Sequence, residues 1–451
     1  MIEQLAAMLK YEAYKNSGVE WLGKIPAHWD ITRLGTRFEE RRQKVSDKDF
    51  HPLSVTKNGI LPQLETAAKT NDGDNRKLVR KGDFVINSRS DRKGSSGVSD
   101  RDGSVSLINI VLEPKGIQPQ YCQYLLKSYA FIEEFYRMGH GIVADLWTTR
   151  YDEMKAVIMG VPPFPEQIAI AAFLDRKTAQ MDQAVAIKEK QIALLKEHKQ
   201  ILIQNAVTRG LNPSAPMRDS GVKWIGEIPA HWICARLKMH SKIQSGITLG
   251  KSYLQQNFVE MPYIRVANVQ SGYFKLDDIA TISVPNNEIP RYLLQNGDIL
   301  VTEGGDIDKL GRGTVWRDEI KPCLHQNHVF AIRVNQSILS QDFVSNFLAT
   351  DMARKYFIDT ATKTTNLAST NRTHLGNLYL PLPSLTEQAA IVAHIETEST
   401  KIDRAISIQQ QQIDKLKEYK ATLINSAVTG KIRVPALVES SAPELSDSLV
   451  A

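Results

Sequence analysis

The sequence predicts an α+β protein in which two domains of one fold alternate with two long helices. One observation is a repeated stretch: Ser17–Trp29 returns as Ser220–Trp232 with ten of thirteen residues identical, at an offset of 203 residues. A second is a repeated helical run, because the run from Glu166 to Thr208 returns between Glu387 and Thr429 at an offset of 221 residues. The residues between the repeats are largely unlike. We therefore expect one repeated frame that presents two different heads.

Both heads, head 1 (30–160) and head 2 (233–380), contain short apolar runs bounded by turn residues and followed by a helical pattern. The expected strands and helices are Lys81–Asn87, Val105–Val111 and Tyr121–Phe135 in head 1, and Asn296–Thr302, His328–Val334 and Gln341–Phe357 in head 2. A Gly-Asp dipeptide lies in the first of these strands in both heads. The shared order predicts that both heads have the same α+β fold.

The two repeated helical runs have apolar residues at heptad spacing, which predicts coiled-coil seams. The seam residues are Leu174, Met181, Val185, Ile192, Leu195 and Leu202 in the first run, and Ile395, Ile402, Ile406, Ile413, Leu416 and Leu423 in the second. A polar residue interrupts each seam at the same heptad position, Lys188 in one and Gln409 in the other. Because the chain holds two copies, we expect them to pair with each other, with homodimerisation or docking onto other subunits as the alternatives.

The composition excludes several classes of protein. With 42% hydrophobic and 24% charged residues, the chain has an ordinary globular composition. It contains no apolar run long enough to span a membrane, and its first residues do not resemble a signal peptide. The three scattered cysteines fit a reducing cytoplasm. A net charge of +6 is compatible with nucleic acid as a partner but does not identify one.

The repeats and composition divide the chain into seven segments. These are 1–29, an N-terminal conserved segment; 30–160, the first head; 161–211, the central spacer helix; 212–232, a linker with the repeated stretch; 233–380, the second head; 381–432, the distal spacer helix; and 433–451, a Ser-rich acidic tail expected to be disordered.

Three patterns resemble catalytic or ligand sites without meeting their requirements. The stretch Ser245–Ser252 lacks the first glycine of a phosphate-binding loop at the required spacing. Cys323, His325 and His328 offer three metal ligands but no evident fourth. The repeated His28 and His231 each lie between Ala and Trp, which favours a packing or hydrogen-bonding role at a domain junction over catalysis. We expect no catalytic site and no metal site in this chain.

The repeated Trp-x-Gly-x-Ile-Pro-x-His-Trp motif, followed in each half by a proline-rich Glu-Gln motif, resembles the specificity (S) subunit of type I restriction–modification enzymes. The resemblance extends from Ser17 to Ile432, and both motifs occur twice in the same order. It implies that the heads are target recognition domains in a pseudo-twofold arrangement, each reading half of a bipartite, asymmetric DNA site. It also implies that the two long helices form an antiparallel spacer.

The same resemblance implies double-stranded DNA and two kinds of protein partner. Two methyltransferase (M) subunits would dock on the helices and methylate adenine N6, and restriction (R) subunits would join them. S-adenosylmethionine, ATP and Mg²⁺ would be bound by those partners, with no cofactor in this chain. A cytoplasmic location and no membrane association follow from that role.

Within the heads, we expect DNA contacts from polar and basic loops that flank the Gly-Asp strands or precede the long helices. The candidates are Ser88, Arg89, Ser90, Arg92, Lys93, Thr148, Thr149 and Arg150 in head 1, and Lys251, Thr302, Glu303, Lys309, Arg312, Lys363, Thr364, Thr365 and Asn366 in head 2.

Two other classes of function stay open on the sequence alone. A stand-alone bipartite DNA-binding regulator or scaffold would share the two heads, but would not need helices with surface left for docking. A catalytic fusion or ATPase would depend on the loop from Gly246 to Ser252.

Overall fold

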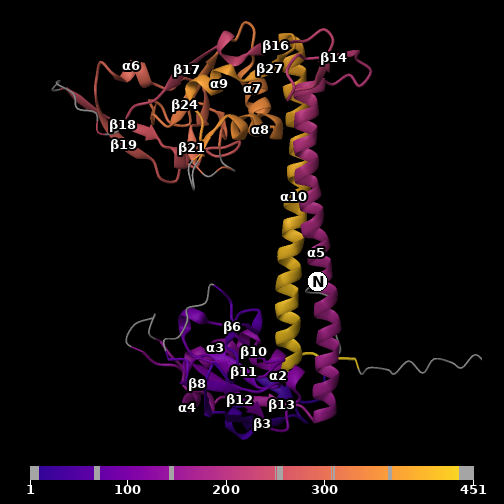
Figure 1. The fold of residues 1–451 in the computed structure, drawn as a ribbon. Helices are drawn as coiled ribbons and strands as arrows, with labels where there is room; N and C mark the ends of the chain where they lie inside the picture. The colour runs from indigo at the N-terminus through magenta and orange to yellow at the C-terminus, as the bar shows by residue number, and fades with distance from the viewer. Residues whose placement is uncertain are drawn as a thin grey trace, which may run out of the picture. The chain divides into compact units, whose positions relative to one another are not determined.

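The computed structural model describes residues 10–65, 72–141, 147–248, 250, 257–305, 307, 310–363 and 368–435. The chain forms two compact units, unit 1 (1–188 and 410–451) and unit 2 (189–409). Each unit contains one head and one half of each long helix, α5 (Phe164–Arg209) and α10 (Leu385–Val428) (Figure 1). None of the described helices has the length and apolarity that crossing a membrane requires.

The elements of unit 1 other than the long helices are β1 (Tyr14–Asn16), β2 (Lys24–Pro26), β3 (Asp30–Arg33), β4 (Phe38–Glu40), β5 (Lys44–Val45), β6 (Leu53–Thr56), β7 (Gly59–Pro62), β8 (Arg76–Val79), β9 (Phe84–Asn87), β10 (Ser96–Val98), β11 (Gly103–Val105), β12 (Asn109–Pro114), α2 (Pro119–Leu126), α3 (Tyr129–Arg137), α4 (Tyr151–Met154) and β13 (Ile158–Val161).

Those of unit 2 are β14 (Met217–Asp219), β15 (Glu227–Pro229), β16 (Ile233–Arg236), β17 (Ser241–Ser245), β18 (Phe258–Ile264), β19 (Ala280–Pro285), α6 (Ile289–Tyr292), β20 (Ile299–Thr302), β21 (Gly304–Gly305), β22 (Gly313–Val315), β23 (Leu324–His325), β24 (Val329–Val334), α7 (Gln341–Leu348), α8 (Asp351–Thr360), β25 (Thr362–Lys363), β26 (Ala368–Ser369), α9 (Arg372–Asn377) and β27 (Tyr379–Leu382).

Both heads are built on the same four-stranded antiparallel sheet. Its order is β10-β9-β12-β4 in head 1 and β22-β20-β24-β17 in head 2, and the central pair is β9 with β12 or β20 with β24. Two helices follow in each case, α2 and α3 or α7 and α8. The two α+β heads with long helices that the sequence predicts are therefore confirmed.

The central strands are continuously apolar because both faces of the sheet are covered. Phe84 and Ile86 of β9 pack with the helices, whereas Val85 between them packs against Val79 and Leu53 from neighbouring strands. Successive side chains of a strand point to opposite faces, so three consecutive apolar residues serve two cores.

The predicted Gly-Asp strands begin with a turn that both heads share. Asp83 accepts a hydrogen bond from the Arg80 backbone N–H at 2.8 Å, and Asp298 accepts one from the Gln295 N–H at 2.8 Å. The glycine before each aspartate has a positive φ, 94° at Gly82 and 92° at Gly297. The dipeptide thus marks the start of the central strand, which is why it could be recognised in both halves.

Three predicted elements are each broken into two, for local reasons. The predicted helices Tyr121–Phe135 and Gln341–Phe357 are interrupted by Ser128 and Thr350, whose hydroxyls accept N-cap hydrogen bonds at the start of α3 and α8. The predicted strand Val105–Val111 is split between β11 and β12 by a turn, in which the Asn109 side-chain and backbone N–H groups bond to the Ser106 carbonyl.

In each unit the two repeated motifs meet. Glu166 accepts a hydrogen bond from Trp29 Nε1 at 3.2 Å and contacts His28 Nε2 at 2.7 Å. In unit 2, Glu387 lies 3.3 Å from Trp232 Nε1 and 2.8 Å from His231 Nε2. The repeated histidines therefore have the hydrogen-bonding role at the junction that the sequence predicts.

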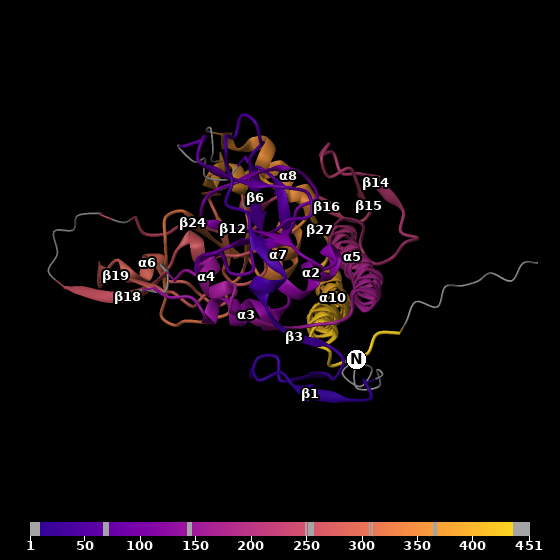
Figure 2. The same ribbon diagram turned by 90° about the horizontal axis from the view of Figure 1, so that it is seen from below.

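The long helices pair within each unit. In unit 1, Asp182 of α5 lies 2.6 Å from Lys420 of α10, and Lys188 contacts Gln412, so the two helices run in opposite directions. In unit 2 the equivalent ion pair joins Lys199 to Asp403 at 2.7 Å. Figure 2 shows the helices side by side in a second view. All twelve predicted seam residues are buried or half-buried.

Candidate nucleic-acid interface

In head 1 the two candidate segments lie against each other and form one edge, which we call edge 1 (88–93 and 147–150). Arg89 and Thr148 form a β-bridge. The Ser90 N–H donates to the Trp147 carbonyl at 3.0 Å, and the Thr149 N–H donates to the Ser88 carbonyl at 3.0 Å. Residues some 60 positions apart in the sequence are thus held together by main-chain hydrogen bonds.

The side chains of edge 1 differ in what they can reach. Ser88 and Thr149 are buried, and the Thr149 hydroxyl donates to the Phe135 carbonyl at 2.9 Å, so both side chains serve the core rather than a ligand. Lys93 is paired with Glu133, and Arg92 with Asp91. Arg89 and Arg150 are exposed and have no ion pair within the described part of head 1. They are the two cations most available to a phosphate or a base.

Edge 2 (302–305, 312, 328, 362–363 and 368–372) lies at the same place in head 2. It includes a small sheet in which β26 pairs with both β21 and β25. The Thr370 N–H donates to the Glu303 carbonyl at 2.7 Å, and the Thr302 N–H donates to the Arg312 carbonyl at 3.0 Å. Of the predicted candidates, Thr302, Glu303, Arg312 and Lys363 therefore lie together.

Not every head 2 candidate is placed or exposed. Lys251, Lys309, Thr364, Thr365 and Asn366 lie outside the described residues. Thr302 is fully buried, so its side chain, like that of Ser88, faces the core. Lys363 is exposed.

The structure adds candidates that the sequence reasoning missed. The bond from Thr149 to Ser88 in head 1 corresponds to the bond from Thr370 to Glu303 in head 2. Asn371 and Arg372 therefore follow the same contact as Arg150, and both are exposed. The sequence does indicate this correspondence, because Thr370 lies 221 residues after Thr149, the same offset that separates the repeated helices.

The two edges carry different charges. Edge 1 presents Arg89 and Arg150, and its one carboxylate, Asp91, is paired with Arg92. Edge 2 presents Lys363 and Arg372 together with a carboxylate, Glu303, whose Oε2 contacts Nδ1 of His328. Two edges of one geometry with different donors and acceptors can recognise different ligands of one class.

The three residues considered as metal ligands are used otherwise. His325 is buried, and its Nδ1 lies 2.7 Å from the Val329 carbonyl. His328 is exposed and contacts Glu303, while the buried Cys323 thiol is directed to the Leu324 carbonyl. Burial lowers the pKa of His325 to about 4, so this imidazole is neutral at physiological pH.

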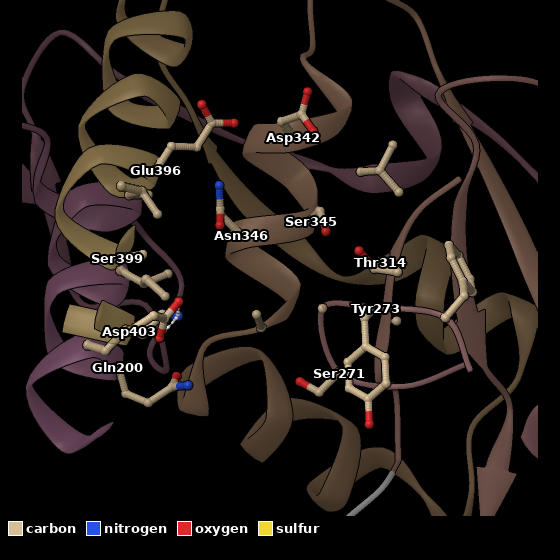
Figure 3. A pocket seen from close by; sticks show the side chains of 18 of the residues that line it. Gln200, Ser271, Tyr273, Thr314, Asp342, Ser345, Asn346, Glu396, Ser399 and Asp403 are labelled. Carbon is tan, nitrogen blue, oxygen red and sulfur yellow. Dashed lines mark hydrogen bonds and ion pairs between the residues drawn. The ribbon is translucent and has the colours of Figure 1, made fainter. Parts of the chain in front are cut away.

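A groove of about 900 Å³ lies in unit 2 between head 2 and the two long helices (Figure 3). Asn346 and Tyr273 from the head face Glu396 and Ser399 from α10 across it (Figure 3). Unit 1 has a groove of about 940 Å³ at the corresponding place. There the Tyr124 hydroxyl donates to Asp175 Oδ1 at 2.6 Å.

Comparison with known proteins agrees with this architecture. Residues 236–418 match the model of the type I restriction modification DNA specificity domain. The chain is 24% identical over 435 residues to the type I restriction enzyme MjaVIII specificity subunit of Methanocaldococcus jannaschii, covering 92% of this chain and 95% of that relative.

Two solved structures have the same fold. One is a chain from a study of complex assembly and conformational transition of the type I R-M system, with a TM-score of 0.67 and 16% identity over 90% of this chain and 98% of that one. The other is the HsdS subunit from Thermoanaerobacter tengcongensis, with a TM-score of 0.52, 17% identity and the same coverage. Residues 236–418 thus contain a type I restriction modification DNA specificity domain, and the chain as a whole is similar to the specificity subunits of type I restriction–modification enzymes.

Proposed function

We propose that this chain is the DNA-recognition subunit of a type I restriction–modification complex. Head 1 reads one half of a bipartite, asymmetric site and head 2 reads the other half. The observation that carries the proposal is the pair of edges: one fold, repeated, places different polar and charged side chains at equivalent positions. A frame that repeats while its edges diverge is suited to two unlike half-sites.

Binding would combine two kinds of contact. Four cations of the two edges are exposed: Arg89, Arg150, Lys363 and Arg372. All four can bind phosphates, and the three arginines can also bind the major-groove edge of a guanine. Each neutralised phosphate releases counterions, so affinity should fall steeply with salt. The target adenine must leave the helix stack to be methylated at N6, and we assign that pocket to the methyltransferase partner. S-adenosylmethionine, ATP and Mg²⁺ would likewise be bound by partner subunits.

The long helices offer a surface for those partners. In unit 2, Leu194 and Ile201 of α5 lie one heptad apart and are 55% and 52% exposed, outside the seam with α10. Apolar residues repeated at heptad spacing on an outward face suit another helix. We assign this face to methyltransferase subunits, two per chain, with restriction subunits joining them, in the cytoplasm where the DNA lies. A stand-alone regulator would have no use for it.

The test is methylome sequencing of a host that carries this gene with its methyltransferase partner, compared with a strain lacking the gene. We expect a new adenine-methylation motif of two parts separated by unread bases. Replacing residues 30–160 with another head should change one part only. Absence of new methylation, with the complex formed, would contradict the proposal and favour a scaffold or regulator.

A further inference from the structure

Edge 2 contains a side-chain pair that has no equivalent in head 1. Glu303 directly follows β20, and His328 directly precedes β24. Thr302 and Val329 are partners in the ladder between these strands, so Glu303 and His328 form the next pair outward. The corresponding residues of head 1, Ser88 and Ile108, cannot form a charged contact.

The main chain of Glu303 is fixed on both sides. Its N–H donates to the His328 carbonyl at 2.9 Å, and its own carbonyl accepts from the Thr370 N–H at 2.7 Å. The Glu303 side chain is 27% exposed and contacts the His328 ring, which is 56% exposed. A group held in this way by its backbone and by a neighbouring side chain is preorganised for a ligand.

Glu303 is paired differently from three other carboxylates of head 2. Asp298, Asp342 and Asp278 each form an ion pair with an arginine. Within the described residues, the one ion-pair partner of Glu303 is a histidine, which is neutral unless protonated. A carboxylate at a DNA-binding edge repels phosphates, so a favourable contact with a base must compensate for it.

The chemistry of the bases selects one partner. A carboxylate only accepts hydrogen bonds. In the major groove, guanine presents two acceptors, thymine presents an acceptor and a methyl group, and adenine presents its N6 amino group beside the N7 acceptor. Cytosine presents only the N4 amino donor. Cytosine is therefore the base that an ionised carboxylate matches without repulsion.

We propose that Glu303 reads a cytosine in the half-site of head 2 by accepting a hydrogen bond from its N4 amino group, and that His328 is the positioning residue that orients the carboxylate. This inference rests on the proposed function and adds one base and one residue to it. It also predicts that the two half-sites differ in chemistry, since edge 1 has no exposed carboxylate in the equivalent position.

The experiment uses the full chain in complex with its methyltransferase partner. Binding is measured to duplexes that carry every single-base substitution of the methylated motif. In the wild type, one position of the head 2 half-site should require cytosine. Glu303→Gln should lower the preference for cytosine over the other bases at that position by about 5- to 150-fold, which is the contribution of one good base contact. Nonspecific binding should become stronger, because a negative charge near the phosphates is removed.

His328 is tested by the same base preferences, which a merely structural role would not change. His328→Ala should weaken discrimination at the same position, and His328→Asn, which keeps a neutral donor, should restore part of it. Glu319→Gln is the matched control, since this exposed glutamate of head 2 lines the groove beside the helices. It should leave every preference unchanged.

Two results would overturn the inference. One is a Glu303→Gln complex, folded and bound to its partner, with unchanged base preferences at every position. The other is a Glu303→Gln complex whose base preference changes at a position that requires adenine instead of at one that requires cytosine. A wild-type complex that recognises no bipartite motif would instead refute the proposed function itself, so the two failures are distinguishable.

Discussion

The junction between head and helix is built differently in the two units. In unit 1, the Tyr124 hydroxyl of α2 bonds to Asp175 and contacts Thr178 of α5. Unit 2 has Asn346, Glu396 and Ser399 at the corresponding positions, with no hydrogen bond between Asn346 and α10 in the described structure, and the Ser399 hydroxyl is buried without a partner.

Other junction contacts are the same in both units. The His–Glu contact and the Lys–Asp ion pair between the helices occur twice. The two grooves also have similar volumes, about 900 and 940 Å³. The difference is therefore one of chemistry rather than of space. Duplication has preserved the His–Glu contact at the base of each head and the Lys–Asp ion pair between the helices, whereas the contact between the head helix and the long helix that lies between them has diverged.

The largest effect should come from the shared contacts. Trp29 and Trp232 are fully buried at the base of their heads. Replacing either with alanine should lower the free energy of unfolding of its own unit by about 3–5 kcal/mol. Hydrogen exchange measured by mass spectrometry should show faster exchange in unit 1 for Trp29→Ala and in unit 2 for Trp232→Ala. Equal acceleration in both units by either variant would show that the units do not unfold separately.

A second prediction concerns pH and should distinguish the heads. Because burial lowers the pKa of His325 to about 4, below the value of about 6.5 for an exposed histidine, the unfolded chain binds a proton more tightly. The contribution of His325 to the free energy of unfolding is therefore fully present above about pH 6.5 and is lost as the pH falls toward 4. The loss is about 3 kcal/mol at most.

Head 1 should lack this dependence, since its described histidines, His51 and His140, are exposed. Hydrogen exchange is measured at pH 7 and pH 5 and corrected for intrinsic rates. The lower pH should speed exchange in head 2 and not in head 1. His325→Val should abolish the difference between the two pH values. Persistence of that difference in the variant would assign it to other groups.

The smallest effect should come from the diverged contact. Burial and the bond to Asp175 raise the pKa of Tyr124, so its hydroxyl remains a donor throughout the physiological range. Tyr124→Phe should destabilise unit 1 by about 1 kcal/mol. Asn346→Tyr should stabilise unit 2 by a similar amount if the new hydroxyl reaches Glu396. Urea denaturation of both variants measures the change, and a stabilised Tyr124→Phe variant would contradict the role assigned to this bond.

The frame could be predicted from the sequence because its signals are local and repeated. Heptad spacing identified α5 and α10, and the Gly-Asp turn identified the central strand of both heads. The breaks at Ser128 and Thr350 were missed, since an apolar pattern continues across an N-cap. The edges were predicted only in part: Ser88, Thr149 and Thr302 are polar but buried, and polarity alone does not report exposure. Arg372 was missed because the 221-residue offset was not extended into the head.

The residues after each repeated glutamate have a consequence for how such genes can change. Gln167 accepts from the backbone N–H of Gln118 and donates to the Pro162 carbonyl. Gln388 does the same with the Ser340 N–H and the Pro383 carbonyl, and also donates to the Ile338 carbonyl.

These glutamines hold main-chain atoms, which every amino acid except proline supplies in full. A head can therefore change its side chains without losing this attachment. Homologous recombination between the repeated stretches would exchange whole heads while leaving every bond of the attachment intact, so new combinations of half-sites can arise in a single genetic event.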